Sequence, residues 1–228
     1  MIFNQVPRTY NISELDDQII PGYGRVYTTP QGVRYPSVTT VLSTYNKEGL
    51  EKWKKEVGEV EAEAIKNQYG RSGTKLHNIA EKYVLNDPEW NKEIDPLTAF
   101  LFQDIKNILD KNVDNIMESE VPLYSDFLKV GGRVDLIADW QGKRSVIDFK
   151  NSRRPKRKEW ILGYFLQMSA YCVMFEERTQ IPINNCVVLI AINDAPAQIF
   201  NIKRNDYIMD FIKHRKTFKE IDQVNPYK

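Results

Sequence analysis

Short apolar segments dominate the second half of the chain. Four of them are rich in β-branched residues and bounded by Gly, Asn or Asp, and they predict strands at residues 116–124, 128–139, 143–151 and 185–193. Between the last two, residues 159–179 are apolar on almost every side, which predicts a well-buried helix. Strands followed by a packed helix and another strand predict a mixed sheet covered by helices.

A hairpin is predicted near the start of the chain. Residues 25–28 and 33–35 flank the turn signal Pro30-Gln31-Gly32. Ser37 follows the second of these segments and is placed to cap a short helix at residues 38–43.

Three further helices are predicted before the strands. A long polar helix is expected over residues 48–69, where "GRSGT" should end it, and Thr74 should cap a second helix at 75–85. The third helix follows Pro96. Its predicted apolar side consists of Leu97, Phe100, Leu101, Ile105, Ile108 and Leu109.

These elements predict one α/β domain over residues 1–228, with a central mixed β-sheet flanked by helices. Residues 1–72 form an N-terminal hairpin and helical elaboration, residues 73–200 the core, and residues 201–228 a C-terminal helix and tail. A hydrophobic content of 42% is enough to build a sizeable core.

Composition narrows the class of protein. The formal net charge is only +1, which excludes a uniformly basic nucleic-acid coat but not a local basic patch. Cys172 and Cys186 are too few for a zinc ribbon, an iron–sulfur cluster or a disulfide framework, so we expect reduced core cysteines. Neither a secretory signal nor a membrane span is evident, so we expect the cytoplasm of a bacterial or phage-infected cell.

Two charged residues interrupt the predicted strand "SVIDFKNSRR". Asp148 and Lys150 alternate with apolar neighbours, so both should lie on one face of the strand. A hairpin turn centred on Gln141-Gly142 would place Asp135 directly opposite Asp148, with Cβ atoms about 4.5–5.5 Å apart. Two facing carboxylates should destabilise the ladder.

A divalent cation would remove that repulsion. Mg²⁺ or Mn²⁺ takes carboxylate oxygens together with waters and a substrate phosphate, and it lowers the pKa of a bound water. A lysine on the same face can orient the water or stabilise the charge that develops in the transition state. The alternative is a buried salt bridge between Lys150 and the aspartates, with no chemistry.

Several motifs occur in the order typical of one nuclease group. "GTKLH", "GGRVD", "VIDFK" and "QMSAY" are preceded by "YPSVTTVL" and span residues 34–191. This order resembles the RecB-like branch of the PD-(D/E)XK nucleases, and within it the mitochondrial and phage exonucleases. The resemblance implies a restriction-endonuclease-like core. Val134 replaces the proline of the superfamily name, and the four cysteines of the iron–sulfur subtype are absent.

The resemblance also implies roles for individual residues. Asp135, Asp148 and the backbone carbonyl of Phe149 would be metal ligands, and Lys150 would be the catalytic lysine. His77 would be a further catalytic residue and metal ligand, contributed by a helix. Another helix carries Gln167 and Tyr171, which would support the site or contact DNA.

Other candidates keep two interpretations. Glu81 follows His77 by one helical turn and would either hydrogen-bond the imidazole or be solvated. Glu118 or Glu120 could add a carboxylate, although an exposed strand face is the simpler interpretation. Ser37, Thr39 and Thr40 would bind phosphates or merely cap a helix.

A basic run leaves the end of the predicted catalytic strand. We expect it to bind phosphates without sequence preference, although such runs are often simply solvated. The expected DNA-contacting residues here are Ser152, Arg153, Arg154 and Lys156. Four aromatic residues are candidates either for base stacking or for core packing, namely Tyr35, Tyr45, Trp53 and Tyr69.

The sequence therefore predicts a Mg²⁺- or Mn²⁺-dependent DNA exonuclease without an iron–sulfur cluster, acting on single strands or duplex ends. The alternatives are a structure-selective endonuclease on the same core and a non-catalytic DNA-binding module. DNA is the expected partner and no membrane association is expected, while the sequence leaves open which proteins, if any, it binds.

Overall fold

A five-stranded mixed sheet forms the centre of the computed structural model, which describes residues 1–45, 47–92, 94–193 and 195–218. The strand order is β4-β5-β6-β7-β8. Only β6 and β7 are parallel; the other neighbours are antiparallel. The strands are β4 (Val113–Ser125), β5 (Val130–Trp140), β6 (Lys143–Ser152), β7 (Asn185–Ile192) and β8 (Gln198–Lys203).

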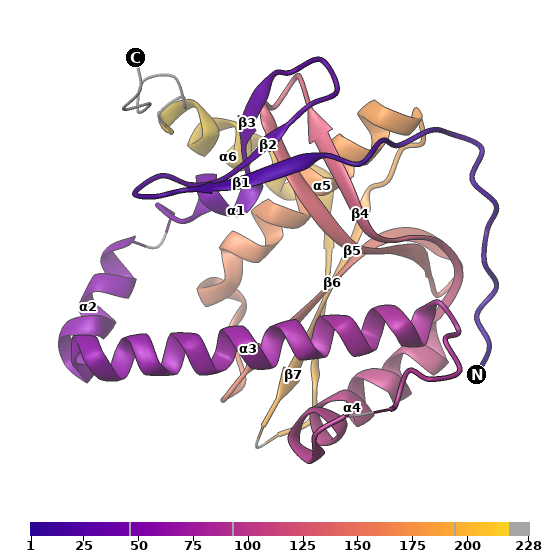
Figure 1. Ribbon diagram of the computed structural model, residues 1–228, viewed down its shortest axis with the longest axis horizontal. Helices are drawn as coiled ribbons and strands as arrows, with labels where there is room; N and C mark the ends of the chain where they lie inside the picture. The colour runs from indigo at the N-terminus through magenta and orange to yellow at the C-terminus, as the bar shows by residue number, and fades with distance from the viewer. Residues whose placement is uncertain (46, 93, 194, 219–228) are drawn as a thin grey trace.

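Helices cover both faces of this sheet (Figure 1). On one face lie α3 (Glu59–Val84) and α4 (Pro96–Asn112), and on the other α1 (Val38–Leu42), α5 (Leu162–Thr179) and α6 (Arg204–Thr217). Successive side chains of β6 point to opposite faces of the sheet, so Ile147 and Phe149 pack toward α3 and α4 while Val146 packs toward α5. The expected α/β fold with a mixed central sheet is confirmed.

A small antiparallel sheet precedes the core. It consists of β1 (Asp16–Ile20), β2 (Gly24–Thr28) and β3 (Arg34–Pro36), and only β1 was not predicted. Ser37 caps α1 as expected, since its hydroxyl accepts the amide N–H of Thr40. This small sheet docks tightly on β5, because a Cβ on Gly131 would lie only 2.6 Å from the Cβ of Tyr27.

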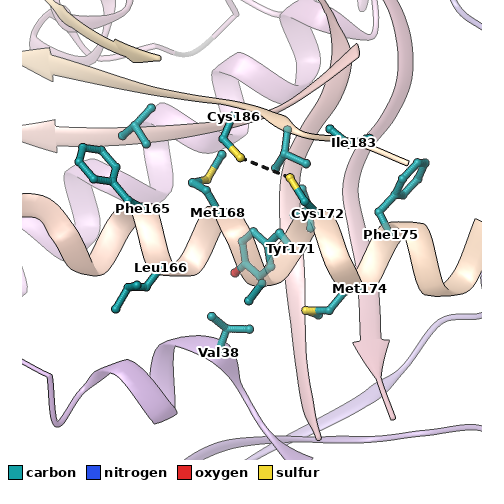
Figure 2. Close-up of a cluster of buried hydrophobic side chains, with 14 of the residues drawn as sticks. Val38, Phe165, Leu166, Met168, Tyr171, Cys172, Met174, Phe175, Ile183 and Cys186 are labelled. Atoms are coloured by element: carbon teal, nitrogen blue, oxygen red, sulfur yellow. Dashed lines mark hydrogen bonds between the residues drawn. The ribbon is translucent and has the colours of Figure 1, made fainter. Parts of the chain in front are cut away.

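The helix α5 is the best-buried helix, as its apolar pattern predicts. Figure 2 shows its side chains packed between the sheet and α1, with Phe165, Met168 and Phe175 among them. Cys172 on this helix lies 3.3 Å from Cys186 on β7, measured between the sulfur atoms, and both are buried free thiols. The expected position of both cysteines in the core is confirmed.

The helix break predicted at "GRSGT" is wrong. The chain instead breaks at Gly58, whose φ of 95° separates α2 (Lys47–Val57) from a continuous α3 of 26 residues. Thr74 is not a cap; its hydroxyl bonds back to the carbonyl of Gly70 within the helix. Apolar packing of the second half of α3 on the sheet overrides the weak helix propensity of its glycines.

The apolar side of α4 is also shifted from the prediction. Leu97 and Phe100 are exposed, at 48% and 65%, while Phe102 is buried against the sheet with Leu101 and Ile105. The strand β8 and the short 3₁₀ helix η1 (Lys158–Ile161) were not predicted as separate elements. None of the described helices is long and apolar enough to cross a membrane.

Replacement of Gly70 tests the continuity of α3. Gly70→Ala should raise the free energy of unfolding by up to about 1 kcal/mol, because alanine is the better helix former and nothing lies within 4 Å of the added Cβ. Urea unfolding measures the change. Gly131→Ala, which would strike Tyr27, should instead destabilise the protein by about 1–3 kcal/mol. A loss of stability in the Gly70 variant would contradict a continuous helix.

Candidate active site

The strands β5 and β6 separate at the point where the charged residues begin. Their pairing runs in the predicted register and ends with Leu136 opposite Ile147. The next positions are Asp135 and Asp148, which therefore lie just beyond the ladder. The amide N–H of Phe149 does not continue the ladder but donates to Asp135 Oδ2 at 2.8 Å. The side chain of Asp135 thus fills the gap between the strands.

Asp148 and Lys150 share the face of β6 that α5 covers, as alternation predicts. The Asp148 side chain is 1% exposed, and Lys150 Nζ forms an ion pair with its Oδ2. On α5, Gln167 Nε2 lies 3.4 Å from Asp148 Oδ1 and donates to the Tyr171 hydroxyl at 3.0 Å. Both of these α5 side chains are buried, so their geometry fits support of the carboxylate and not direct contact with DNA.

Two aromatic rings complete this face of the site. The ring centre of Tyr164 lies 5.3 Å from Lys150 Nζ, a cation–π contact that the sequence did not suggest. Tyr171 packs so closely on β5 that a Cβ on Gly132 would lie 2.7 Å from its ring. The second glycine of "GGRVD" therefore makes room for the tyrosine.

His77 approaches Asp135 from the opposite face. It lies on α3, with Nδ1 3.3 Å from Asp135 Oδ2 and 3.8 Å from Glu120 Oε1, and its ring meets that of Phe149 edge to face. One nitrogen or oxygen from each of His77, Glu120 and Asp135 falls within 4.8 Å of the others. The sheet is thus reached from both sides at the split between β5 and β6.

Glu120 joins the site because β4 is distorted there. The pairs on either side of it are regular, but Glu120 has a φ of 48°, in the left-handed region. The Arg133 guanidinium donates to its backbone carbonyl. Glu118 is buried elsewhere, in an ion pair with Arg8. The simpler interpretation of an exposed strand face is therefore wrong for both glutamates.

The charges in the site perturb one another. Burial lowers the pKa of His77, but its hydrogen bond to Asp135, with that residue's charge, outweighs burial and raises the pKa to about 10. Burial raises the pKa of Asp148 to about 6, and the charge of Asp135 adds to the shift. Burial acts likewise on Asp135, yet His77 and Lys150 hold its pKa below the ordinary value.

The residues fit a divalent cation. The buried Asp148 Oδ2 has Lys150 Nζ as its ion-pair partner among the described residues. Burial still raises the pKa of Asp148, so the ammonium group does not fully offset the cost of the buried charge, and a bound metal cation would reduce that cost further. The donor set of carboxylate oxygens and one imidazole nitrogen suits Mg²⁺ or Mn²⁺.

An open cleft leads to His77. It has a volume of about 630 Å³ and is bordered by Gly73 of α3, Arg133 of β5 and Asn151 of β6. Glu81 also lines it, and burial together with the charge of Glu120 raises the Glu81 pKa. The cleft brings solvent and any substrate to the side of the site formed by α3.

The candidate phosphate-binding residues divide by exposure. Ser37 is buried and occupied as a helix cap, while Thr39 is exposed. Ser152 is buried and bonds the backbone of Arg154. Arg153 and Arg154 are exposed, and Lys156 is half-buried.

Of the four candidate stacking residues, the structure describes the side chains of two, Tyr35 and Tyr45, and neither is exposed. Tyr35 is half-buried and donates to Asp126, and Tyr45 packs edge to face on His214. The side chains of Trp53 and Tyr69 lie outside the described part of the structure.

Comparison with known proteins adds a family match. Residues 37–223 match the model of the PD-(D/E)XK nuclease superfamily. Human mitochondrial genome maintenance exonuclease 1 is 33% identical over 131 residues, which cover 53% of this chain and 38% of that protein. The chain thus spans well under half the length of this curated relative.

Two solved structures are also similar. A candidate exonuclease from Eubacterium rectale has 10% sequence identity and a TM-score of 0.38, with 65% of this chain and 69% of that chain covered. The protein SSO0001 has 15% identity and a TM-score of 0.32, with 65% and 75% covered.

Removal of the Asp148 charge should stabilise the metal-free protein. The folded-state pKa of about 6 exceeds the ordinary 3.8, so ionised Asp148 disfavours folding above pH 6, and that penalty shrinks as the pH falls. Asp148→Asn should raise the free energy of unfolding at pH 7.5 by about 1–3 kcal/mol. Urea unfolding in EDTA checks it, and the gain should fall by about half at pH 5. A less stable variant at pH 7.5 would contradict the inference that ionised Asp148 disfavours folding of the metal-free protein.

Proposed function

Because the chain belongs to the PD-(D/E)XK nuclease superfamily, we propose that it is a metal-dependent DNA exonuclease that hydrolyses single strands or DNA ends. The observation that carries the proposal is the convergence of Asp135, Asp148 and Lys150 where β5 and β6 separate. His77 joins them from α3, which favours the RecB-like branch.

Metal binding would fall to the residues around the strand split. Asp135 and Asp148 contribute carboxylates, His77 an imidazole nitrogen and Phe149 its backbone carbonyl, with Glu120 as a further carboxylate. The bound cation supplies a Lewis acid that polarises the scissile phosphate and lowers the pKa of a water. The hydrogen bond from Phe149 N–H fixes one oxygen of Asp135 and so helps to orient the other.

Lys150 is the group that would act on the reacting atoms. Its ion pair with Asp148 and its contact with the Tyr164 ring hold the ammonium group beside the carboxylates. Burial lowers the pKa of Lys150, but the charges of Asp148 and Asp135 outweigh burial and raise it, so the side chain stays charged. A fixed cation there can orient the attacking water and stabilise the negative charge that develops on the phosphate.

Substrate binding would be electrostatic and independent of sequence. The exposed arginines that follow β6 lie on the same chain segment as Lys150 and suit phosphate oxygens. The name of the human relative supports the assignment as an exonuclease. The match covers only part of that human protein.

Digestion of end-labelled DNA tests the proposal. In Mg²⁺ the protein should degrade linear single-stranded DNA and leave a circular strand of the same sequence intact, because an exonuclease needs an end. Asp148→Asn and Lys150→Ala should each reduce the rate at least about 10³-fold, since each removes a group that acts in the transition state. The products are separated on denaturing gels.

Circular dichroism of both variants serves as the control for folding. Cleavage of the circle would point to an endonuclease on the same core. DNA binding without any product in Mg²⁺ would point to a non-catalytic binding module, and retained activity in either variant would overturn the assigned roles.

His77→Ala should change metal binding directly. Loss of the imidazole should weaken Mn²⁺ binding by about tenfold or more and Mg²⁺ binding less, because imidazole is a poorer ligand for Mg²⁺ than for transition metals. Calorimetric titration of each metal measures the effect without DNA. His214→Ala is the matched control, since His214 hydrogen-bonds the backbone of Val41 and Thr44 Oγ1, away from the carboxylates. Unaltered titrations for His77→Ala would exclude it as a ligand.

A further inference from the structure

An exposed tryptophan lies in the connection between the strand that carries Lys150 and the helix that carries Tyr164. Trp160 is in η1 (Lys158–Ile161), the short helix that joins β6 to α5, and it is 60% exposed. Its neighbour Ile161 is buried in the core. The backbone is therefore anchored at Ile161 while the indole faces solvent and is accessible to a ligand.

Cations surround this tryptophan along the chain. Every residue from 153 to 158 except Pro155 is basic, and we call this stretch the basic segment. The guanidinium of Arg157 lies 5.3 Å from the ring centre of Trp160. An exposed aromatic ring beside positive charges is the combination that binds single-stranded nucleic acid, in which bases stack and phosphates are neutralised.

The fold connects Trp160 directly to the catalytic groups. The basic segment begins just after Lys150 and Ser152 on β6, and α5 carries Tyr164 against Lys150 and Gln167 near Asp148. Trp160 precedes Tyr164, whose ring lies against Lys150, by only four residues.

We propose that Trp160 stacks on an unpaired base of single-stranded DNA whose phosphates are bound by the basic segment, and so sets the position of the scissile phosphate beside Lys150. This inference rests on the proposed nuclease function and identifies the substrate form that the site accepts. A paired base is covered on both faces by its neighbours, so the stacking contact selects single strands or frayed ends.

A purely local role for the ring is the competing explanation. In that case the indole would only pack on Arg157 and hold η1 in place. Loss of the indole would then lower the stability of the protein, and any effect on DNA affinity would be the same whichever base the ligand lacks. The chain offers a matched control in Phe127, which is 72% exposed in the turn between β4 and β5. The neighbouring Asp126 binds Arg178 near the end of α5, so Phe127 lies near the opposite end of this helix from Trp160.

Fluorescence anisotropy with a labelled single-stranded oligonucleotide in EDTA tests the proposal without cleavage. Trp160→Ala should weaken binding about tenfold, Trp160→Phe should retain most of the affinity, and Phe127→Ala should bind like wild type. Equal affinity of Trp160→Ala and wild type would overturn the proposal, as would an equal loss in Phe127→Ala.

A series of oligonucleotides with one abasic site each then separates stacking from a structural role. At one or two positions the missing base should reduce wild-type affinity to that of Trp160→Ala and should leave the variant unaffected. A uniform deficit of the variant at every position would overturn stacking. Because binding is measured without catalysis, its failure is distinct from a failure of wild-type digestion in Mg²⁺, which would count against the nuclease function alone.

Discussion

The interruption of the β5–β6 ladder after Leu136 and Ile147 is the constraint on which the rest of the site depends. If pairing continued, the amide of Phe149 would bond a main-chain carbonyl and close the sheet. Instead a side-chain carboxylate, that of Asp135, accepts this hydrogen bond. The exchange satisfies the buried amide, so separating the strands costs little. It also opens the sheet to side chains from both helical layers, which is why His77 on α3 reaches Asp135 while Lys150 beneath α5 pairs with Asp148.

This arrangement concentrates charge where a fold alone would avoid it. Asp148, Asp135 and Lys150 are buried together, and the raised pKa of Asp148 indicates that the attraction of Lys150 and His77 does not fully offset the cost of burying its charge. Low local polarity strengthens both the attraction and the repulsion. A divalent cation would offset the remaining cost of the buried carboxylates, whereas replacement by apolar residues would give a more stable but inert sheet. The apolar clusters on both faces supply the stability that offsets this local cost.

Alternation of apolar and charged residues was sufficient to predict the face shared by Asp148 and Lys150, and the hairpin register followed from a single turn. Features that depend on tertiary packing were not predictable in this way. The left-handed φ of Glu120 redirects its side chain toward His77, and no local pattern in "ESEVPLY" signals it. The continuity of α3 through Gly70 depends on packing against the sheet. The sequence did not predict that Trp160 is exposed, because residues 159–179 are apolar on almost every side. The same pattern therefore describes Trp160 and its buried neighbour Ile161.

Covalent proximity explains how one segment could combine chemistry with substrate positioning. Residues 150–164 run from the end of β6 to the first turn of α5. They include Lys150, the exposed cations, Trp160 and Tyr164, whose ring lies against Lys150. Both ends of this segment are anchored, since β6 is a central strand and α5 packs in the core from Phe165 to Phe175 (Figure 2). The distance between a stacked base and the lysine is therefore set by the connection itself and not by a separate domain. A stacking contact of this kind binds an unpaired base whatever its identity, which suits an enzyme that must degrade any sequence.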